Sequence, residues 1–282
     1  MSGGAWSPDQ YEQFKDERSR PFFDLLALVK RREGMRVADL GCGTGELTRA
    51  MHRELGARET VGVDVSESML ARSAAFAGDG LRFERSSIEA WSPNAPVDLV
   101  FSNAALQWVD DHRTLLPRLA SMLAPGGQIA VQIPSNDHHP SHVVAAEVAR
   151  ESPFREALGG YVRVFPNLAI ADYALLLDAL GFREQHVRKQ VYLHRLASSD
   201  AVVEWVKGTL LTDYAKRMDD EMNARFIARY REALRERLRE TGPAEARPVG
   251  ARLAESRPQE AGPAEARPYP YSFERTVFWG AR

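Results

Sequence analysis

The sequence has a single cysteine, no long apolar run and almost no excess of charge. Cys42 alone allows neither an internal disulfide bond nor a cysteine-based metal cluster. No segment approaches the roughly 20 apolar residues of a membrane helix, and residues 1–14 lack the charged-then-apolar pattern of a secretory signal. The formal net charge of −2 does not attract nucleic acid or an anionic membrane. We therefore expect a soluble cytoplasmic protein, a monomer or weak dimer, without nucleic-acid, membrane or metal partners.

From residue 22 to about residue 150, strand-like and helix-like segments alternate. Strand-like segments occur at residues 36–40, 60–63, 81–84, 97–101 and 128–133, and residues 97–101 form a continuous apolar run of the buried-strand type. Strands that alternate with helices predict a parallel sheet covered on both faces. The expected fold class is therefore α/β, with a Rossmann-like, doubly wound, mostly parallel sheet.

The second half of the chain predicts a helical cap and two further strands. Residues 242–270 differ in kind, because the segment GPAEARP occurs twice and the composition has too little apolar mass to offset the entropy of ordering. The final segment alternates as a strand and must return to the sheet to bury its apolar face. The expected divisions are a cofactor-binding core with an N-terminal lid (1–133), cap helices (134–181 and 194–241), core strands (182–193 and 271–282) and a flexible loop (242–270).

The run VADLGCGTG at residues 37–45 ends in three glycines at every second position. A dinucleotide-binding loop has a different glycine spacing, and a phosphate-binding P-loop requires a lysine that is missing here. The carboxylate of Asp39 would repel a phosphate but suits the ammonium group of an amino acid. Asp39, Gly41, Gly43 and Gly45 therefore favour S-adenosylmethionine (SAM) over NAD or a P-loop nucleotide.

A second carboxylate, Asp64, ends the apolar strand TVGVD, nineteen residues after the glycine loop. At this place in an α/β fold an acidic side chain accepts hydrogen bonds from both ribose hydroxyls. The alternative is that Asp64 caps the helix that begins near Ser66. At the end of the third strand a serine oxygen can accept a bond from an adenine amino group. We expect the cofactor to contact Asp64, Val65, Ser87 and the backbone of Ile88.

Four motifs in order resemble those of the class I SAM-dependent methyltransferases. They are VADLGCGTG, VGVDVSESML, FSNAALQW and LAPGGQIAV. The resemblance implies SAM as methyl donor and S-adenosylhomocysteine as product. It further implies that Asn103 and Ala104 lie under the sulfonium, and that Gln107 and Trp108 position the substrate. The alternative for Trp108 is an aromatic residue of the core.

Longer segments resemble the trans-aconitate 2-methyltransferase family. They are WSPDQYEQFKDERSRPFFDLL (6–26), FSNAALQWVDDH, VQIPSN with the following PSH, and VEWVKGT (203–209). The resemblance implies formation of a methyl ester on a small polycarboxylate. A carboxylate is already ionised at neutral pH, so the enzyme has only to align it with the methyl–sulfur bond and exclude water.

Residues outside these motifs are candidates for a lid and for substrate contacts. Aromatic and basic residues near the N-terminus could fold over the cofactor, with an arginine facing an anionic substrate. The alternative is an amphipathic helix with solvated arginines. A histidine cluster after the fifth strand lacks a carboxylate or cysteine, which disfavours a metal site. The lid candidates are Tyr11 and Phe14, and the substrate-contact candidates are Arg18, Arg20, His138, Trp205 and Lys207.

Two departures from the family pattern alter the expected acceptor. GTLLTD at residues 208–213 replaces GTGLRP, so that Thr212 or Asp213 stands in place of an arginine, and PSN at residues 134–136 replaces PDN. Losing a cation and gaining a carboxylate disfavours a tricarboxylate and favours a monocarboxylic acid or another metabolite. Two alternatives remain: methylation of a hydroxyl, with His112 or His138 as base, and a SAM-binding regulator without catalysis.

Overall fold

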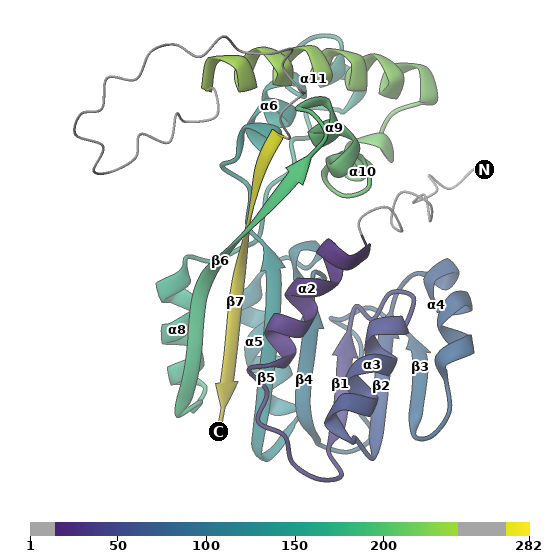
Figure 1. Ribbon diagram of the computed structural model, residues 1–282, viewed down its shortest axis with the longest axis vertical. Helices are drawn as coiled ribbons and strands as arrows, with labels where there is room; N and C mark the ends of the chain where they lie inside the picture. The colour runs from purple at the N-terminus through teal and green to yellow at the C-terminus, as the bar shows by residue number, and fades with distance from the viewer. Residues whose placement is uncertain (1–14, 242–268) are drawn as a thin grey trace, which may run out of the picture. The chain divides into compact units, whose positions relative to one another are not determined.

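The computed structural model describes residues 15–241 and 269–282, and the chain forms two compact units. The first, here called the sheet unit, comprises residues 15–135, 165–191 and 274–282. The second, here called the helical unit, comprises residues 136–164, 192–241 and 269–273. Tyr11, Phe14 and most of the repeat segment lie outside the described residues. Figure 1 shows the elements of both units.

A seven-stranded sheet, with the order β3-β2-β1-β4-β5-β7-β6, forms the sheet unit. The first five strands pair in parallel, whereas β7 runs antiparallel to β5. This mixed, mostly parallel sheet confirms the predicted fold class. The order reverses between β1 and β4, and open α/β sheets bind ligands at such a switch point. The strands are β1 Arg36–Leu40, β2 Glu59–Asp64, β3 Leu81–Arg85, β4 Val97–Asn103, β5 Leu123–Pro134, β6 Glu184–Leu196 and β7 Tyr269–Ala281.

Helices cover both faces of the sheet because successive residues of each central strand point to opposite faces and both sets are apolar. On one face, Phe22 and Leu25 of α2 (Lys15–Leu26) and Met51 of α3 (Glu46–Leu55) pack on β1, β4, β5 and β7. On the other face, α5 (His112–Ser121) and α8 (Ile170–Ala179) pack on the same strands. The smaller α4 (Glu67–Ser73) contacts β2 and β3.

Helix α8 departs from the expected division of the chain. Tyr173 and Leu177 are fully buried in the core beneath β5 and β7, so α8 belongs to the sheet unit. The cap expected at residues 134–181 therefore does not contain this helix. Its apolar periodicity indicates a helix with a buried face but not the partner of that face.

The helical unit is organised around α11 (Asp220–Thr241), which packs against α6 (Pro140–Val148). Phe226, Tyr230 and Leu234 form an apolar stripe along α11 and are buried. The hydroxyl of Tyr230 donates a 2.9 Å hydrogen bond to the carbonyl of Ser141. The remaining helices are α7 Phe154–Ala157, α9 Asp200–Lys207 and α10 Leu210–Ala215. Among the described helices, none has the length and apolarity to cross a membrane.

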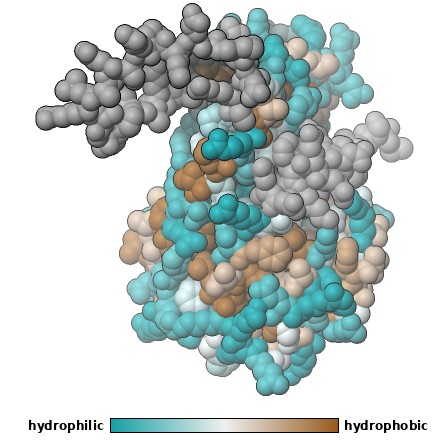
Figure 2. Space-filling view, viewed as in Figure 1, coloured by the Kyte–Doolittle hydropathy of each residue, from teal (hydrophilic) through white to brown (hydrophobic). Residues whose placement is uncertain are grey.

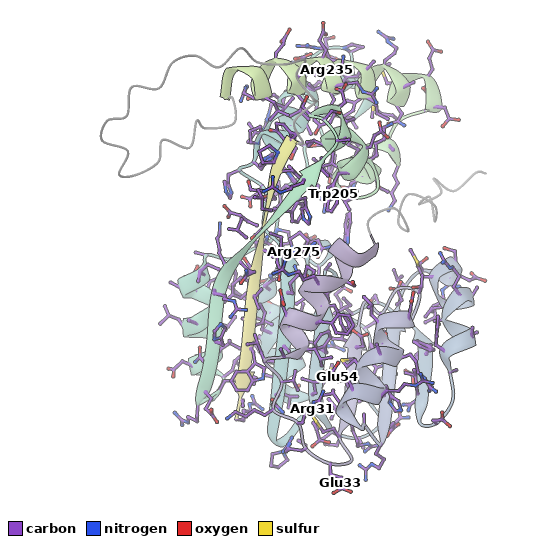
Figure 3. All side chains as sticks on the ribbon, viewed as in Figure 1. Arg31, Glu33, Glu54, Trp205, Arg235 and Arg275 are labelled. Atoms are coloured by element: carbon purple, nitrogen blue, oxygen red, sulfur yellow. The ribbon has the colours of Figure 1, made fainter. Side chains whose placement is uncertain are left out.

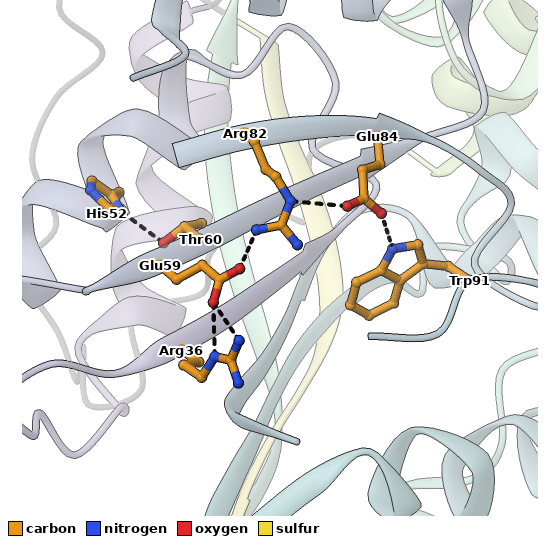
Figure 4. A network of polar contacts seen from close by, with 7 residues as sticks. All are labelled: Arg36, His52, Glu59, Thr60, Arg82, Glu84 and Trp91. Carbon is orange, nitrogen blue, oxygen red and sulfur yellow. Dashed lines mark hydrogen bonds and ion pairs between the residues drawn. The ribbon is translucent and has the colours of Figure 1, made fainter. Parts of the chain in front are cut away.

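A network of hydrogen bonds and ion pairs links the edge strand β3 to β2 and β1 (Figure 4). Glu59 of β2 accepts a 2.8 Å hydrogen bond from Nε of Arg36 in β1, and also one from Arg82 in β3. Arg82 in turn donates a 3.0 Å bond to Glu84, whose second oxygen accepts a 2.7 Å bond from the indole of Trp91. The network joins the first three strands of the sheet, from the beginnings of β1 and β2 to the end of β3.

The apolar side chains left exposed are scattered. They include Phe23 on α2 and Val191 and Leu193 on β6. Figure 2 shows apolar groups interspersed with hydrophilic ones on one face of the molecule. Scattered exposure of this kind is ordinary for a protein surface and marks no particular partner.

Candidate active site

The glycine loop continues β1 and begins α3. Gly41 has a φ of +83°, and a Cβ atom built there would lie 2.1 Å from Cβ of Ala105, so only glycine fits. Gly43 also has a positive φ, of +56°, but a Cβ there would meet nothing within 4 Å. The backbone of Gly43 therefore borders open space at the switch point. Gly45 closes the loop with a 3.1 Å bond from its N–H to the carbonyl of Cys42.

The carboxylate of Asp64, at the end of β2, is held by two backbone N–H groups. Oδ2 accepts a 2.9 Å bond from Gly43 and Oδ1 accepts a 2.9 Å bond from Ser66. Each oxygen keeps a lone pair that can accept a ribose hydroxyl. The side chain of Ser66, not that of Asp64, caps α4 by accepting from the N–H of Met69. Val65 follows with its side chain exposed.

Asp39 lies beneath the loop and is almost fully buried. Burial raises the pKa of its carboxyl to about 7; the hydrogen bond from Thr48 acts against this shift and the charge of Asp64 adds to it. A cation beside a buried carboxylate stabilises the ionised form. Asp39 and Asp64 thus fit the ammonium and ribose groups of SAM respectively. Burial, with the charge of Asp39 next, also raises the pKa of the Cys42 thiol far above its ordinary value, which leaves it unreactive.

The residues expected near the adenine follow β3 and are half-buried. Oγ of Ser87 accepts a 3.2 Å bond from the N–H of Ala90, and the carbonyl of Ile88 accepts a 3.1 Å bond from Arg118. The hydroxyl of Ser87 keeps its own proton and a second lone pair. A contact of Ser87 or Ile88 with adenine stays a prediction.

The motif FSNAALQW forms the end of β4 and a short 3₁₀ turn. Ala104 has a φ of +55° and donates a 2.9 Å bond from its N–H to the carbonyl of Gln132 in β5. Nε2 of Gln107 donates a 2.7 Å bond to the carbonyl of Ala104. Within the described part of the chain, Oδ1 of Asn103 and Oε1 of Gln107 are buried without a hydrogen-bond partner. Trp108 is 49 % exposed, which contradicts the alternative of a core aromatic.

Of the predicted substrate contacts in α2, only Arg20 has a described side chain, and Arg18 does not. Arg20 is exposed, and its Nε lies 3.9 Å from Oδ2 of Asp24, one turn along the helix. A contact of Arg20 with substrate stays a prediction. His138 is exposed and lies in the helical unit.

Two predicted substrate contacts have partners within the helical unit: for Trp205 its burial corrects the prediction, whereas for Lys207 a contact with substrate stays a prediction. Trp205 is a core residue: its ring is buried 4.4 Å, centroid to centroid, from that of His194. Nζ of Lys207 lies 2.8 Å from Oε1 of Glu204, so its charge is paired. The apolar stripe of α9, on which Trp205 lies, faces the core and not a binding surface.

Asp213, which with Thr212 was a candidate for the position of a family arginine, is also paired. Asp213 accepts a hydrogen bond from the hydroxyl of Tyr161, and its Oδ1 lies 2.6 Å from Nη1 of Arg217. Burial raises the pKa of Asp213, but the bonds from Tyr161 and Arg217 outweigh it and hold the pKa below its ordinary value. Asp213 is thus neutralised within the helical unit.

His112, one base considered for a hydroxyl acceptor, is fully buried. Its Nδ1 lies 2.5 Å from the hydroxyl of Tyr173 and its Nε2 lies 2.9 Å from the carbonyl of Leu106. Burial lowers its pKa. Both ring nitrogens are engaged in the core, so His112 does not reach a substrate. Among the described residues no group of three or more histidine, cysteine or acidic side chains could hold a metal ion.

The sequence analysis did not single out one polar pair, at the carboxyl end of β5 and in the middle of β7. Nη1 of Arg275, labelled in Figure 3, donates a 2.9 Å hydrogen bond to Oε1 of Gln132, and both side chains are buried. The available signal was weak: Gln132 lies within the motif VQIPSN, but Arg275 stands in a strand that carries several other polar residues.

Comparisons with known proteins bear on this site. A family model described as a methyltransferase domain matches residues 37–127. The trans-aconitate 2-methyltransferase of Deinococcus radiodurans is 43% identical over 233 residues, which cover 80% of this chain and 89% of that protein. The enzyme of the same name from Variovorax paradoxus is 42% identical over 228 residues, covering 80% and 87% respectively.

Solved structures are similar in fold at low sequence identity. The YcgJ protein from Bacillus subtilis matches with a TM-score of 0.56 and 14% identity, covering 93% of this chain and 98% of that chain. Phosphoethanolamine N-methyltransferase 2 of Haemonchus contortus, solved in complex with SAM, matches with a TM-score of 0.52 and 15% identity. That match covers 94% of this chain and 52% of the other.

Proposed function

The chain belongs to the trans-aconitate 2-methyltransferase family of SAM-dependent methyltransferases, and we propose that it methylates a carboxylate of a small polycarboxylic acid such as trans-aconitate. The observation that carries this proposal is the similarity to relatives named for that activity, which extends over most of both chains. The substrate in their name enters here as the first candidate acceptor.

The residues at the switch point fit SAM, which supplies an electrophilic methyl group on a sulfonium. Asp39 would hold the ammonium of its methionine part, and the two fixed oxygens of Asp64 would accept the ribose hydroxyls. Gln107, fixed by its bond to the carbonyl of Ala104, would help to orient the acceptor beside Asn103. Alignment of the two reactants is the main contribution that this arrangement makes to the rate.

A carboxylate acceptor suits the site better than a hydroxyl. A carboxylic acid with a pKa near 4 is ionised at neutral pH and needs no base. A hydroxyl must lose its proton as it attacks, and both nitrogens of His112 are occupied in the core. His138 is exposed and supplies no argument for the hydroxyl alternative.

The test is incubation of the full chain with methyl-labelled SAM and a panel of trans-aconitate, cis-aconitate, citrate and aliphatic monoacids. We expect a base-labile labelled ester from a polycarboxylate. Ester from monoacids alone would overturn the polycarboxylate assignment and would support the expectation drawn from Thr212 and Asp213. Binding of SAM with no label transferred to any acid would contradict methylation of carboxylates altogether.

Location and assembly stay predictions from the sequence. A cytoplasmic monomer or weak dimer without nucleic-acid partners is what composition and charge favour. Light scattering of the purified chain tests the oligomeric state.

A further inference from the structure

We infer that Gln132 and Arg275 anchor a second carboxylate of the acceptor, one that does not receive the methyl group. The inference rests on the proposed function, because it assumes a polycarboxylate acceptor. It names the residues that select this class of substrate, which neither the motifs nor the comparisons identify.

The pair lies at the carboxyl end of β5, where the middle of the antiparallel strand β7 runs beside it. Residue Pro134 of β5 pairs with Arg275 of β7, and Gln132 pairs with Val277, so Arg275 reaches Gln132 diagonally. Period-two alternation puts both side chains on the face that carries Ala130 and Val277, which is covered by α2. Arg275 is 6% exposed and Gln132 is fully buried. A guanidinium can hold a carboxylate through charge-assisted hydrogen bonds.

The hydrogen bond to Arg275 fixes the orientation of the Gln132 amide. An arginine side chain only donates hydrogen bonds, so the oxygen Oε1 must face it and the amide group Nε2 must point the other way. Nε2 is buried, and no described residue accepts its protons. A buried donor without a partner is costly, and a ligand oxygen would remove that cost. The arrangement therefore presents an amide donor and a cation together.

The pair also lies close to the residue expected beneath the methyl donor. Asn103 of β4 is the register partner of Gln132, and neighbouring strands lie about 5 Å apart. Oδ1 of Asn103 is likewise buried without a partner among the described residues. An acid with carboxylates on adjacent carbons could place one at Gln132 and Arg275 and present the other beside Asn103.

Charge decides which carboxylate this pair would hold. A carboxylate bound by a guanidinium has its lone pairs engaged and is a weaker nucleophile. The reacting carboxylate must keep a lone pair directed at the methyl group, so Arg275 suits the carboxylate that stays unmodified. Arg275 would then fill the role left by the family arginine that is absent at Thr212 and Asp213.

The substitution Gln132→Glu tests the inference because it replaces the free amide donor with a carboxylate oxygen and keeps an acceptor for Arg275. We expect the ratio of kcat/KM for the best polycarboxylate to that for a monoacid to fall about 10- to 100-fold, the cost of a lost charged hydrogen bond. The loss should appear in KM for the polycarboxylate, and SAM affinity, measured by calorimetry, should be unchanged.

The matched control is Gln128→Glu, the same change on the same strand and the same face. The amide of Gln128 is fully paired, with bonds of 2.8 Å to the backbone of Lys30 and 3.0 Å from Trp279. This variant should lose thermal stability without a change in substrate selectivity. If Gln132→Glu does not bind SAM, the selectivity is measured instead in Arg275→Lys. This variant keeps the positive charge but loses the ability of a guanidinium to bind a carboxylate through two parallel hydrogen bonds.

The outcomes separate the two proposals. A wild-type chain that esterifies no polycarboxylate refutes the proposed function, and with it this inference. A wild-type chain that prefers polycarboxylates, with variants that keep that preference, overturns the role of Gln132 and Arg275 alone. Reduced selectivity in the Gln132 or Arg275 variant, with the Gln128 variant unaltered, supports it.

Discussion

Thr48 of α3 donates a 2.6 Å hydrogen bond to the carboxylate of Asp39 in β1, and both side chains are buried. The bond favours the ionised form of Asp39, while burial works against it and raises the pKa to about 7. In the ligand-free protein this carboxyl therefore titrates near neutral pH. Binding of the cationic end of SAM should draw it into the ionised form.

We predict from this that SAM affinity rises with pH. Below pH 7 the free protein holds a proton on Asp39 that must leave on binding, so affinity should rise about five- to tenfold from pH 6 to pH 7.5. Calorimetry at several pH values measures it. Asp39→Asn should bind weakly with no such slope, and Thr48→Val should move the rise to higher pH. A flat profile for the unaltered protein contradicts the ammonium role of Asp39.

Asp64→Asn should weaken SAM binding roughly tenfold or more, the scale of a lost charged hydrogen bond. The amide cannot accept from Gly43 and Ser66 at once, because one of its ends now donates. The control is Asp98→Asn in β4, since Asp98 also accepts from a backbone N–H, that of Arg36 at 2.8 Å, away from the switch point. Equal SAM affinities in the two variants would refute the ribose contact.

Two alanine substitutions in the glycine loop should differ in effect. In Gly41→Ala the new Cβ would lie 2.1 Å from Ala105, so we expect the free energy of unfolding to fall by about 2 kcal/mol or more. Gly43→Ala has room and suffers only backbone strain of about 1 kcal/mol. Denaturant unfolding compares them. Similar losses would show that backbone strain, and not the close approach to Ala105, dominates in both.

The succession of strands and helices along the chain, and the carboxylates of the glycine loop, could be predicted because local pattern determines them. The central strands are rich in apolar residues, and Asp39 and Asp64 stand at or next to the ends of their strands. The end of α2 could not be predicted. Apolar residues continue at helical spacing to Val29, but α2 ends at Leu26. Gln128, distant in sequence, pairs with both backbone groups of Lys30 at 2.8 Å and holds the chain in a non-helical path.

The candidate substrate residues were harder to predict for the same reason. Trp205 lies in a motif resembling that of the family, yet its ring packs in a core. Arg275 lies in no motif, yet its guanidinium is buried beside Gln132. Alternation along a strand predicts which face a residue occupies, but partners across strands depend on the register of β5 and β7, which the sequence does not reveal.

The last prediction concerns stability away from the site. Glu59 accepts hydrogen bonds from Arg36 and Arg82, which lower its pKa. A carboxyl whose folded pKa is depressed stabilises the fold above its unfolded pKa, near 4.5, and loses that contribution as pH falls through the folded value. Glu59→Gln should therefore cost about 1 kcal/mol at pH 7, a small value because the side chain is partly exposed, and less as the pH falls below 4.5. Denaturant unfolding at pH 7 and at pH 3 measures the difference.

The control is Glu67→Gln, whose carboxylate is mostly exposed and pairs with Arg85, and which should change little at either pH. An equal cost for Glu59→Gln at pH 7 and pH 3 would show that packing, and not charge, holds β3 to the sheet.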